Sequence, residues 1–375
     1  MKLIHVLIGK ADPNAMGGIN KVVHHLSTSQ LLLGYEVEVW GITETPRQIH
    51  HQHTYKLTLF PKMKNRFTVN KELVKSLDSV SNDTVFHLHS SFRPEIYAVS
   101  RHLKKRNLEW VLTPHGGYTL ISLKKNYWFK KVYRYLFEDR IINGAFAIQS
   151  LGERVETVQF SDKVGVVPNG YELSDTYKKY YSKSGALDLC FCGRLDIYYK
   201  GLDLLFEALV LLRERKVDVT LNLIGGGADR EFLQNMATEN NLDHTVTFSG
   251  IKIGEEKDHL IQQSDIFILT SRSEGLPTAV LEAASMALPL IITLPTNMGE
   301  CVENASAGYV IPEMTAESIS KAIQVAASQK KLGILEQKGK VAREMIKNSF
   351  TWLKIAKLME NNIYSKIDKN YRESD

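Results

Sequence analysis

Long apolar runs are missing from this sequence of 375 residues. No stretch reaches the roughly 18 to 20 apolar residues that a membrane-spanning helix needs. Residues 1–9 also lack the basic start and the cleavage site of a secretory signal. These absences exclude a helical membrane-spanning protein and predict a protein that stays in the cytoplasm.

Cysteine is scarce, with three residues in the chain. An odd number without framework spacing excludes a disulfide-built fold and favours reduced thiols. Cys190 and Cys192 alternate in the apolar run LDLCFCG and therefore share one face of a strand. A zinc site needs about four ligands and this run supplies only a pair. We interpret both residues as structural.

Charge is moderate, at 24% of residues with a net charge of +5, and 43% of residues are hydrophobic. This composition excludes a disordered or fibrous protein. The excess of lysine and arginine lies in the amino-terminal half of the chain, whereas the other half is slightly acidic. The basic half predicts an anionic partner, which could be a membrane surface, a phosphorylated acceptor or a nucleic acid.

Short apolar runs alternate with amphipathic stretches along the whole chain, a pattern typical of βαβ units and parallel sheets. The length also exceeds that of one ordinary domain. We therefore predict an α/β protein with two doubly wound, Rossmann-like domains, residues 1–175 and 184–350, joined by a polar linker. The last helix, within residues 351–375, either continues the second domain or crosses back to complete the first. Ligands of such folds bind at the carboxyl ends of the strands.

The segment SRSEGLPTAVLE, residues 271–282, follows the apolar run DIFILTS. Pro277 stands where a helix begins, and Gly275 leaves room for a ligand beside the backbone. The free N–H groups and the dipole of a helix start favour a phosphate by roughly 0.3 to 2 kcal/mol. Glu274 precedes the helix and Glu282 lies about two turns into it, so both could accept hydrogen bonds from one ligand's hydroxyls. The alternative is a capped helix with a solvated glutamate.

A second cluster, CGRLDIYYKG, has a strand end at Gly193 and a helix start near Gly201. Arg194 and Lys200 flank this turn, and two cations beside a helix amino terminus could clamp a diphosphate. Surface cations are common, so the interpretation gains its weight from the carboxylates of the first segment.

These motifs resemble the retaining glycosyltransferases of family 4, also called glycosyl transferases group 1, which have the GT-B fold of two Rossmann-like domains facing a cleft. The resemblance runs through most of the chain. Its motifs, in the family's order, are GRLD with KGLDLL, LIGGGADR, FSG, SRSEGLPTAVLEAASMALPLI and AGYVIP. Glu274 and Glu282 match the two glutamates of the family's E-x7-E motif. The resemblance implies transfer of a sugar from a nucleoside diphosphate sugar to an acceptor hydroxyl.

By this resemblance, Arg194 and Lys200 bind the donor diphosphate, Glu274 holds hydroxyls of the donor sugar, and Glu282 takes the nucleotide ribose. The other donor contacts that it implies are Gly17, Gly18, Gly193, Ile251, Gly275, Leu276, Pro277 and Thr278.

In the amino-terminal half, AMGGINKVVHHL matches the family's glycine turn at Gly17 and Gly18, although an ordinary helix start is the alternative. The run TPHGGY places His115 and Gly116 at a strand end, where the family has a histidine beside the transferred sugar. A structural loop histidine is the alternative there. The predicted catalytic residues are His115, Glu274, Arg194 and Lys200.

His87 and His89 alternate in TVFHLHS and share one strand face, a geometry that could bind a metal ion. Members of the family commonly have histidine in this strand without a metal, so we favour packing or a contact on the acceptor side. No DxD-type metal motif accompanies the donor motifs, and the predicted reaction needs neither a divalent metal nor another cofactor.

Residues Lys124 to Arg140, KKNYWFKKVYRYLFEDR, interleave cations with aromatic residues. On a helix this pattern is typical of attachment to a membrane interface, and aromatic and basic residues together also suit single-stranded nucleic acid. No nucleic-acid-binding motif accompanies the run, so we expect contact with an anionic membrane. A half-buried helix with a solvated basic face is the alternative.

We therefore expect a retaining glycosyltransferase, and a hexosyltransferase in particular, that uses UDP or GDP sugars in bacterial surface polysaccharide or glycolipid synthesis. In the expected front-face reaction, the departing diphosphate oxygen accepts the acceptor's proton, while His115 positions the sugar and stabilises positive character at the anomeric carbon. A sugar-nucleotide epimerase of the same fold and a non-catalytic sugar- or membrane-binding protein are the alternatives. A Rossmann oxidoreductase is disfavoured, because no G-x-G-x-x-G follows KLIHVLI.

Overall fold

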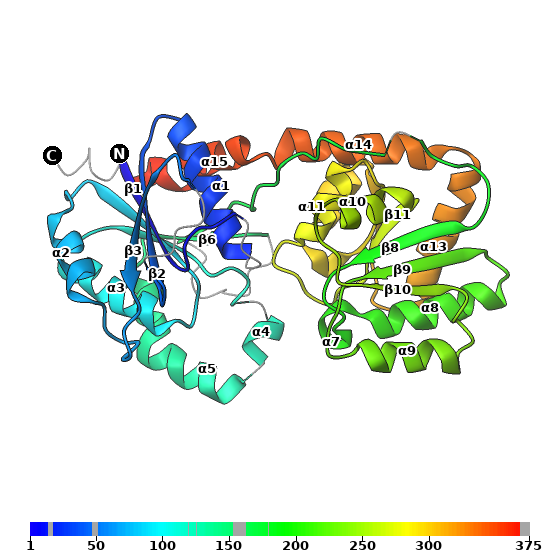
Figure 1. Cartoon of the computed structure of the whole chain (residues 1–375), viewed down its shortest axis with the longest axis horizontal. Coiled ribbons are helices and arrows are strands. Elements are labelled where there is room, and N and C mark those ends of the chain that lie inside the picture. The colour runs from blue at the N-terminus through cyan, green and yellow to red at the C-terminus, as the bar shows by residue number, and fades with distance from the viewer. Residues whose placement is uncertain are drawn as a thin grey trace. The chain divides into compact units, whose positions relative to one another are not determined.

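The computed structural model describes residues 1–13, 18–46, 52–118, 120–124, 126–152, 163–178 and 180–367. The chain forms two compact units, of which the first combines Met1–Gly170 with Trp352–Asp375 and the second is Tyr171–Thr351. Each unit is built on a parallel sheet that carries helices on both faces (Figure 1). This architecture confirms the predicted α/β class with two doubly wound parallel sheets.

The sheet of the first unit has seven strands in the order β3-β2-β1-β4-β5-β6-β7. Their bounds are β1 Lys2–Ile8, β2 Glu36–Thr43, β3 Lys56–Pro61, β4 Thr84–His89, β5 Trp110–Thr113, β6 Ala147–Ser150 and β7 Val164–Val166. The apolar runs of the sequence do not predict β3, because this edge strand is mostly half-buried and has no continuous apolar run. The strand order reverses between β1 and β4, which places a switch point at their carboxyl ends.

Successive strand residues of this sheet face opposite layers, as the pleat requires. Ile4 and Phe86 pack towards α2 (Lys71–Ser79), α3 (Pro94–Lys105) and α6 (Asp139–Gly144). Leu3 and Val85 pack in the opposite layer, where α1 (Gly18–Leu32) meets the C-terminal α15 (Trp352–Met359) and η4 (Glu360–Tyr364). The C-terminal helix thus packs on the first unit. The elements α4 (Leu120–Lys124), α5 (Tyr127–Tyr133) and η1 (Arg134–Glu138) lead into α6.

The sheet of the second unit has six strands in the order β10-β9-β8-β11-β12-β13. Their bounds are β8 Leu187–Cys192, β9 Val219–Ile224, β10 Val246–Gly250, β11 Ile266–Leu269, β12 Leu290–Thr293 and β13 Gly308–Ile311. The order reverses between β8 and β11. The loops that follow these two strands carry the two donor motifs predicted from the sequence, so both motifs lie at one switch point.

Helices cover both faces of the second sheet, with α8 and α9 on one face and α10, α11 and α14 on the other (Figure 1). The helical bounds are α7 Ile197–Lys200, α8 Leu202–Glu214, α9 Arg230–Glu239, α10 Gly254–Gln263, α11 Thr278–Ser285, η3 Leu294–Thr296, α12 Gly299–Ala305, α13 Ala316–Lys331 and α14 Ile334–Ser349. Most of the buried strand residues are Leu, Ile, Val and Phe. This is the composition expected of strands that are covered on both faces.

The segment between the last strand of the first unit and β8 has neither helix nor strand among its described residues. From Tyr171 on it nevertheless packs on the second unit, where Lys178 and Tyr181 are both buried. The Lys178 ammonium donates to the carbonyl of Ser264 at 2.6 Å, and the Tyr181 hydroxyl donates to the carbonyl of Ala287. The polar composition that predicts a linker therefore includes buried anchors.

Candidate active site

Lys200 and Glu274 form an ion pair at the switch point of the second unit. Lys200 Nζ lies 2.5 Å from Glu274 Oε1, and their side chains are 19% and 15% exposed. The Ser271 hydroxyl donates to the same carboxylate oxygen at 2.6 Å. The fold thus brings together a cation from the end of α7 and a carboxylate from the loop after β11.

The loop that carries Glu274 is held from two sides. The Asn297 side-chain amide donates to the backbone carbonyls of Glu274 at 2.7 Å and Gly275 at 3.1 Å. Arg272 makes a bidentate ion pair with Asp203 of α8, at 2.8 and 2.6 Å. Groups fixed in this way need little reorganisation when charge develops on a ligand.

Helix α11 begins at Thr278, with Pro277 as its N-cap residue. Its first backbone bonds are those that the N–H groups of Val280 and Leu281 donate to the Pro277 carbonyl. The N–H groups of the preceding residues have no intrahelical acceptor, which is the property that makes a helix start an anion site. Glu282 lies four residues after Thr278, or about one turn. The predicted depth of two turns is wrong, because it matches the distance from Glu274 rather than from the start of the helix.

Glu282 has two partners that no sequence motif predicts. Lys257 of α10 places Nζ 2.5 Å from Glu282 Oε1, and the Tyr171 hydroxyl donates to the same oxygen at 3.2 Å. Burial alone would lower the pKa of Lys257, but the Glu282 carboxylate outweighs it and raises that pKa. No motif marks Lys257 or Tyr171, and only the tertiary fold brings them to Glu282.

Arg194 and Ile251 lie at the surface. The Arg194 side chain is 64% exposed, with Nη2 3.2 Å from Asp196 Oδ2, and Ile251 is 75% exposed. Within the described residues, Arg194 does not join the Lys200–Glu274 pair. Of the two predicted cations, Lys200 is therefore the one that the structure holds in place.

The glycines after β8 and β9 let two loops press together. Gly225 has φ +143°, and a Cβ atom there would lie 1.9 Å from the Gly193 carbonyl oxygen. A Cβ atom on Gly193 itself would lie 3.3 Å from the Phe191 ring and 4.0 Å from Lys200 Cε. The motif LIGGGADR thus supports the backbone that carries Gly193 and Arg194.

We expect Gly225→Ala to lower the free energy of unfolding by about 2 to 4 kcal/mol, because it adds backbone strain to a clash with a carbonyl that cannot move away. Gly226→Ala is the matched control, since a Cβ there meets only the Ile251 side chain, at 3.0 Å. Its expected cost is below about 1 kcal/mol. Urea denaturation measures both, and equal losses would contradict the role given to Gly225.

In the first unit, His115 follows β5 in a left-handed backbone conformation, with φ 48°. Its Nε2 lies 3.0 Å from His89 Nδ1, and burial lowers the pKa of His115 to about 4, so the ring is neutral near pH 7. Ser90 and Ala11 also have positive φ, at 99° and 50°, after β4 and β1. Strained non-glycine residues cluster at functional sites. Here they gather at the carboxyl ends of three neighbouring strands.

The predicted glycine turn is only partly described. Gly17 lies outside the described residues, and Gly18 is the first residue of α1. From the same helix, the Asn20 side chain accepts the N–H groups of Lys10 and Ala11, each at 2.9 Å. This contact ties the start of α1 to the loop that follows β1.

His87 and His89 are buried in the first unit together with His5. Ligand atoms of these three side chains lie within 4.8 Å of one another, a spacing that could hold a metal ion. Every ring nitrogen of the three already has a hydrogen-bond partner. The geometry is therefore that of a closed hydrogen-bond network, with no lone pair left over for a metal.

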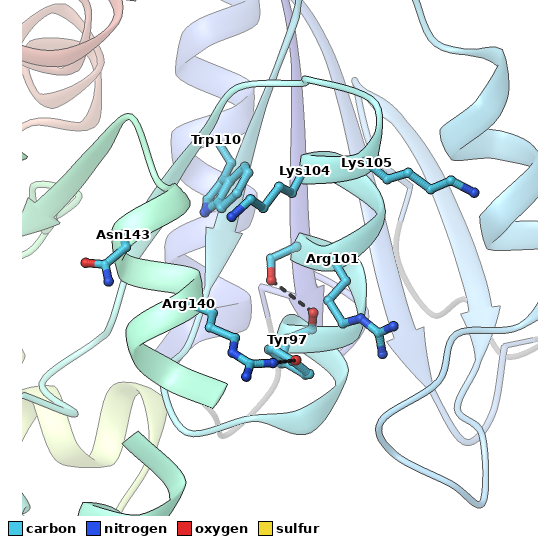
Figure 2. A pocket seen from close by; sticks show the side chains of 8 residues that line it. Tyr97, Arg101, Lys104, Lys105, Trp110, Arg140 and Asn143 are labelled. Atoms are coloured by element: carbon cyan, nitrogen blue, oxygen red, sulfur yellow. Dashed lines mark hydrogen bonds between the residues drawn. The ribbon is translucent and has the colours of Figure 1, made fainter. Parts of the chain in front are cut away.

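A basic cavity of about 540 Å³ lies between α3 and α6 (Figure 2). It is lined by Tyr97, Ser100, Arg101, Lys104, Lys105, Trp110, Arg140 and Asn143. Arg140 donates to the Tyr97 hydroxyl at 3.1 Å. Trp110 is the first residue of β5 and His115 follows the last, so this cavity lies towards the opposite end of the strand. It carries cations but no carboxylate.

The helical run from α5 through η1 presents apolar side chains to solvent. The exposed ones are Tyr127 49%, Trp128 73%, Phe129 66%, Val132 57%, Tyr135 80% and Leu136 40%. We call them the aromatic patch. Lys131 lies over the ring of Trp128, at 5.3 Å. The aromatic residues of the run Lys124 to Arg140 are thus divided, because Tyr133 is buried while this patch is exposed.

A doubly wound sheet with a cation, two carboxylates and a helix start at its switch point is the architecture of a nucleotide-binding α/β domain. Two family models match consecutive parts of this chain. Residues 16–175 match Glycosyltransferase Family 4, and residues 175–351 match Glycosyl transferases group 1. The chain therefore belongs to the family 4, or group 1, glycosyltransferases, a retaining family, and the resemblance inferred from its motifs is confirmed.

Individual relatives agree with this assignment. The chain is similar to a subunit of human phosphatidylinositol N-acetylglucosaminyltransferase, with 22% identity over 373 residues, which are 95% of this chain and 74% of the relative. Its fold is similar to that of the lipopolysaccharide outer core galactosyltransferase WaaB, with TM-score 0.71 and 16% identity over 98% of this chain and 100% of that one. HepE of Anabaena, solved with UDP, gives TM-score 0.70 and 15% identity over 97% and 100%. At these identities the structural likeness shows the GT-B fold.

Proposed function

We propose that this protein transfers a hexosyl group, with retention, from a nucleoside diphosphate sugar to an acceptor hydroxyl in surface polysaccharide or glycolipid synthesis. The observation that carries the proposal is the Lys200–Glu274 pair beside the start of α11. It combines a cation for a diphosphate, a carboxylate for sugar hydroxyls and free N–H groups for phosphate oxygens. The names of WaaB and of the human relative support an acceptor at the cell surface or on a lipid.

Stabilisation of the leaving group is the main contribution of the site. When the bond between the anomeric carbon and the diphosphate oxygen breaks, negative charge develops on the diphosphate. We propose that Lys200, Arg194 and the start of α11 receive that charge. The departing oxygen takes the acceptor's proton while the new glycosidic bond forms on the same face of the sugar. This chemistry requires no divalent metal.

Glu274 is poorly suited to be a covalent nucleophile. A retaining glycosidase places a nucleophile and an acid about 5 Å apart. Here Glu274 Oε1 already accepts hydrogen bonds from Lys200 and Ser271. We propose instead that Glu274 binds hydroxyls of the donor sugar and that Glu282 binds the nucleotide ribose, close to Lys257.

A panel of UDP and GDP sugars tests the function and the donor together. A donor present at 100 times its dissociation constant should stabilise the protein by about 2.7 kcal/mol. With that donor and a lipid-linked acceptor extract, we expect release of the nucleoside diphosphate and a product with the donor's anomeric configuration, read by NMR. A changed sugar nucleotide formed without any acceptor would indicate an epimerase. Stabilisation by no sugar nucleotide in the panel would contradict the proposal.

We also propose that the protein works on the cytoplasmic face of an anionic membrane. The aromatic patch and the basic cavity lie on the same helical run, residues 127–144, and on the facing α3. Aromatic side chains partition into the membrane interface, and each Lys or Arg near an anionic surface contributes about 1 kcal/mol. No helix in the described part of the chain is long and apolar enough to cross a bilayer. We propose that contact through these two surfaces is peripheral.

We expect the protein to co-sediment with vesicles that contain phosphatidylglycerol and to dissociate as the salt concentration rises. Replacing Lys104 and Lys105 by serine should weaken this binding about 30-fold, from about 1 kcal/mol for each cation. Replacing Lys340 and Lys347 of α14, which are also exposed lysines, by serine is the matched control. Equal binding to neutral vesicles, or equal effects of the two double variants, would contradict the proposal.

A further inference from the structure

A continuous line of hydrogen bonds runs beneath the first sheet and ends on His115. Its members come from α1, from four strands, from the C-terminal η4 and from the residues just after β5 and β7, and all of them except His115 are fully or almost fully buried. In order, they are Val167, Gln149, Thr113, His87, Tyr364, Gln30, His5, His89 and His115. We call this set the histidine chain.

The backbone carbonyl of Val167 sets the direction of the chain, because a carbonyl can only accept. Gln149 Nε2 donates to it at 2.8 Å, so Gln149 Oε1 is left to accept from the Thr113 hydroxyl at 2.6 Å. The single hydroxyl proton of Thr113 is then used. Its oxygen must accept from His87 Nε2, 2.5 Å away. A flipped Gln149 amide would set two acceptors against each other at Val167, which excludes the reverse direction.

The direction of hydrogen-bond donation continues through Tyr364 of the C-terminal segment. His87 is neutral, since burial and the neighbouring histidines hold its pKa well below the usual value. With a proton on Nε2, its Nδ1 is a bare lone pair that accepts from the Tyr364 hydroxyl at 2.9 Å. The Tyr364 oxygen in turn accepts from Gln30 Nε2 at 3.3 Å. Gln30 Oε1 therefore faces His5 Nε2 at 2.7 Å and requires a proton there.

The last two hydrogen bonds, from His89 to His5 and from His115 to His89, have their directions fixed in the same way. Burial lowers the pKa of His5 to about 4, so this ring is neutral as well, and its Nδ1 accepts from His89 Nε2 at 2.9 Å. His89 is also buried and neutral, with a pKa well below the usual value. Its Nδ1 accepts from His115 Nε2 at 3.0 Å. The proton of His115 therefore sits on Nε2, and Nδ1 carries a lone pair that is unpaired within the described residues.

We propose that the histidine chain locks His115 in its Nε2–H tautomer, so that Nδ1 acts as a hydrogen-bond acceptor for a hydroxyl of the donor sugar. His89, His5 and Tyr364 are positioning residues in this account, because they act through His115. The contact between His115 and the donor sugar rests on the proposed transferase function. The fixed tautomer of His115 does not depend on that function.

The hydrogen bonds of the histidine chain argue against two other roles, a proton route to solvent and a metal site. A proton passed inward from His115 could reach His89 and His5, but it would stop at the Gln30 amide, which is a very weak base. The chain is therefore not a proton route to solvent. A metal ion bound by His5, His87 and His89 would have to displace hydrogen bonds at all three rings.

Histidine-selective 15N labelling of the full-length protein tests the lock directly, because protonated and bare ring nitrogens give well-separated resonances. His115→Gln identifies the signals of His115 among the 12 histidines. We expect a bare Nδ1 and a protonated Nε2 that persist from pH 6 to pH 8 and are indifferent to EDTA. A proton on Nδ1, a mixture of tautomers, or a shift of the His5, His87 and His89 signals on removal of metal would overturn the proposal.

Tyr364→Phe removes a hydroxyl from the middle of the histidine chain, several hydrogen bonds away from His115. Gln30 then loses the acceptor that fixes its amide, so His5, His89 and His115 can reverse together. We expect a mixture of tautomers at His115 and a fall in kcat/KM of about 2- to 13-fold, which is one hydrogen bond. Tyr181→Phe is the control, because it removes another buried tyrosine hydroxyl bond, in the second unit. A Tyr364→Phe protein that loses stability but keeps the wild-type tautomer would overturn the lock.

Monofluorinated donors test the contact between His115 and the donor sugar, because fluorine cannot donate a hydrogen bond. We expect one ring position at which fluorine weakens donor binding to the wild type about 2- to 13-fold and has no such effect in His115→Ala. Transfer of the parent sugar with no position coupled to His115 would overturn the contact with the sugar while leaving the transferase function standing. Binding of no parent donor would instead refute the transferase function and the contact with the sugar together, and the 15N spectra would still report the tautomer.

Discussion

Lys200→Ala is expected to lower kcat/KM for glycosyl transfer by about 10- to 150-fold, which corresponds to a charge-assisted interaction of roughly 1.5 to 3 kcal/mol. Lys200 is held 2.5 Å from Glu274 at the end of α7. When the glycosidic bond breaks, its ammonium is a preorganised charge for the diphosphate leaving group. Because that interaction strengthens as the bond breaks, the loss should appear in kcat more than in KM.

The expected loss depends on the position of the charge rather than on ion pairing as such. Lys340→Ala is the matched control, since Lys340 also pairs with a glutamate, Glu336 at 2.6 Å, but on the outer surface of α14. Its kcat/KM should equal that of the wild type. Thermal melting of both variants shows whether they are folded. Unchanged transfer by a folded Lys200→Ala protein would remove the diphosphate clamp from the account.

The first unit is expected to lose stability steeply as the pH falls from about 6.5 to about 4. Burial lowers the folded-state pKa of His5 and of His115 to about 4, and it also lowers those of His87 and His89. The unfolded chain therefore binds more protons than the folded chain in this window, and stability rises with pH. For His5 and His115 alone, a shift of this size corresponds to roughly 3 kcal/mol each.

Glu138 has the opposite effect on the pH dependence of stability, which allows a second test. Burial raises its pKa to about 7, although the Tyr118 hydroxyl and the Phe92 N–H donate to its carboxylate. A raised carboxyl pKa contributes stability that is present at low pH and is lost as the pH rises through about 7. Glu138→Gln should therefore make the acid-side loss steeper.

Tryptophan fluorescence is the appropriate measurement for this prediction. The four tryptophans, Trp40, Trp110, Trp128 and Trp352, all belong to the first unit, where the buried histidines lie. Urea denaturation followed at their emission from pH 4.5 to pH 8 gives the dependence of stability on pH. A free energy of unfolding that stays constant between pH 4.5 and pH 6.5 would show that these histidines are not buried and neutral.

Most of the strands were predictable from local pattern. Fully buried parallel strands such as β11 and β12 are short apolar runs of the kind that the alternation of βαβ units requires. The edge strand β3 was not predictable from local pattern, because a half-buried strand has no continuous apolar run. The association of the C-terminal helix was left open, since its apolar face is compatible with either unit, and only its packing against α1 decides the matter.

The candidate site was predictable where its residues belong to a motif that directly follows a strand. The segments that carry Lys200 and Glu274 each follow a strand, so parallel topology brings their ends together. Lys257 and Tyr171 were not predictable, because they reach Glu282 from elements without a motif. The histidine chain was not predictable for the same reason. The sequence places His87 and His89 on one strand face, but His5, Gln30 and Tyr364 become their partners only through the pairing of β1 with β4 and the return of the C-terminal segment.

Hydrogen–deuterium exchange with and without the stabilising sugar nucleotide tests the central claim most directly, because it locates the donor on the chain. We predict slower exchange at residues 193–201 and 271–282, the two loops that meet at the Lys200–Glu274 pair. Lys200→Ala should reduce this protection. A bound sugar nucleotide that leaves both loops unprotected, or that protects only the first unit, would contradict the account.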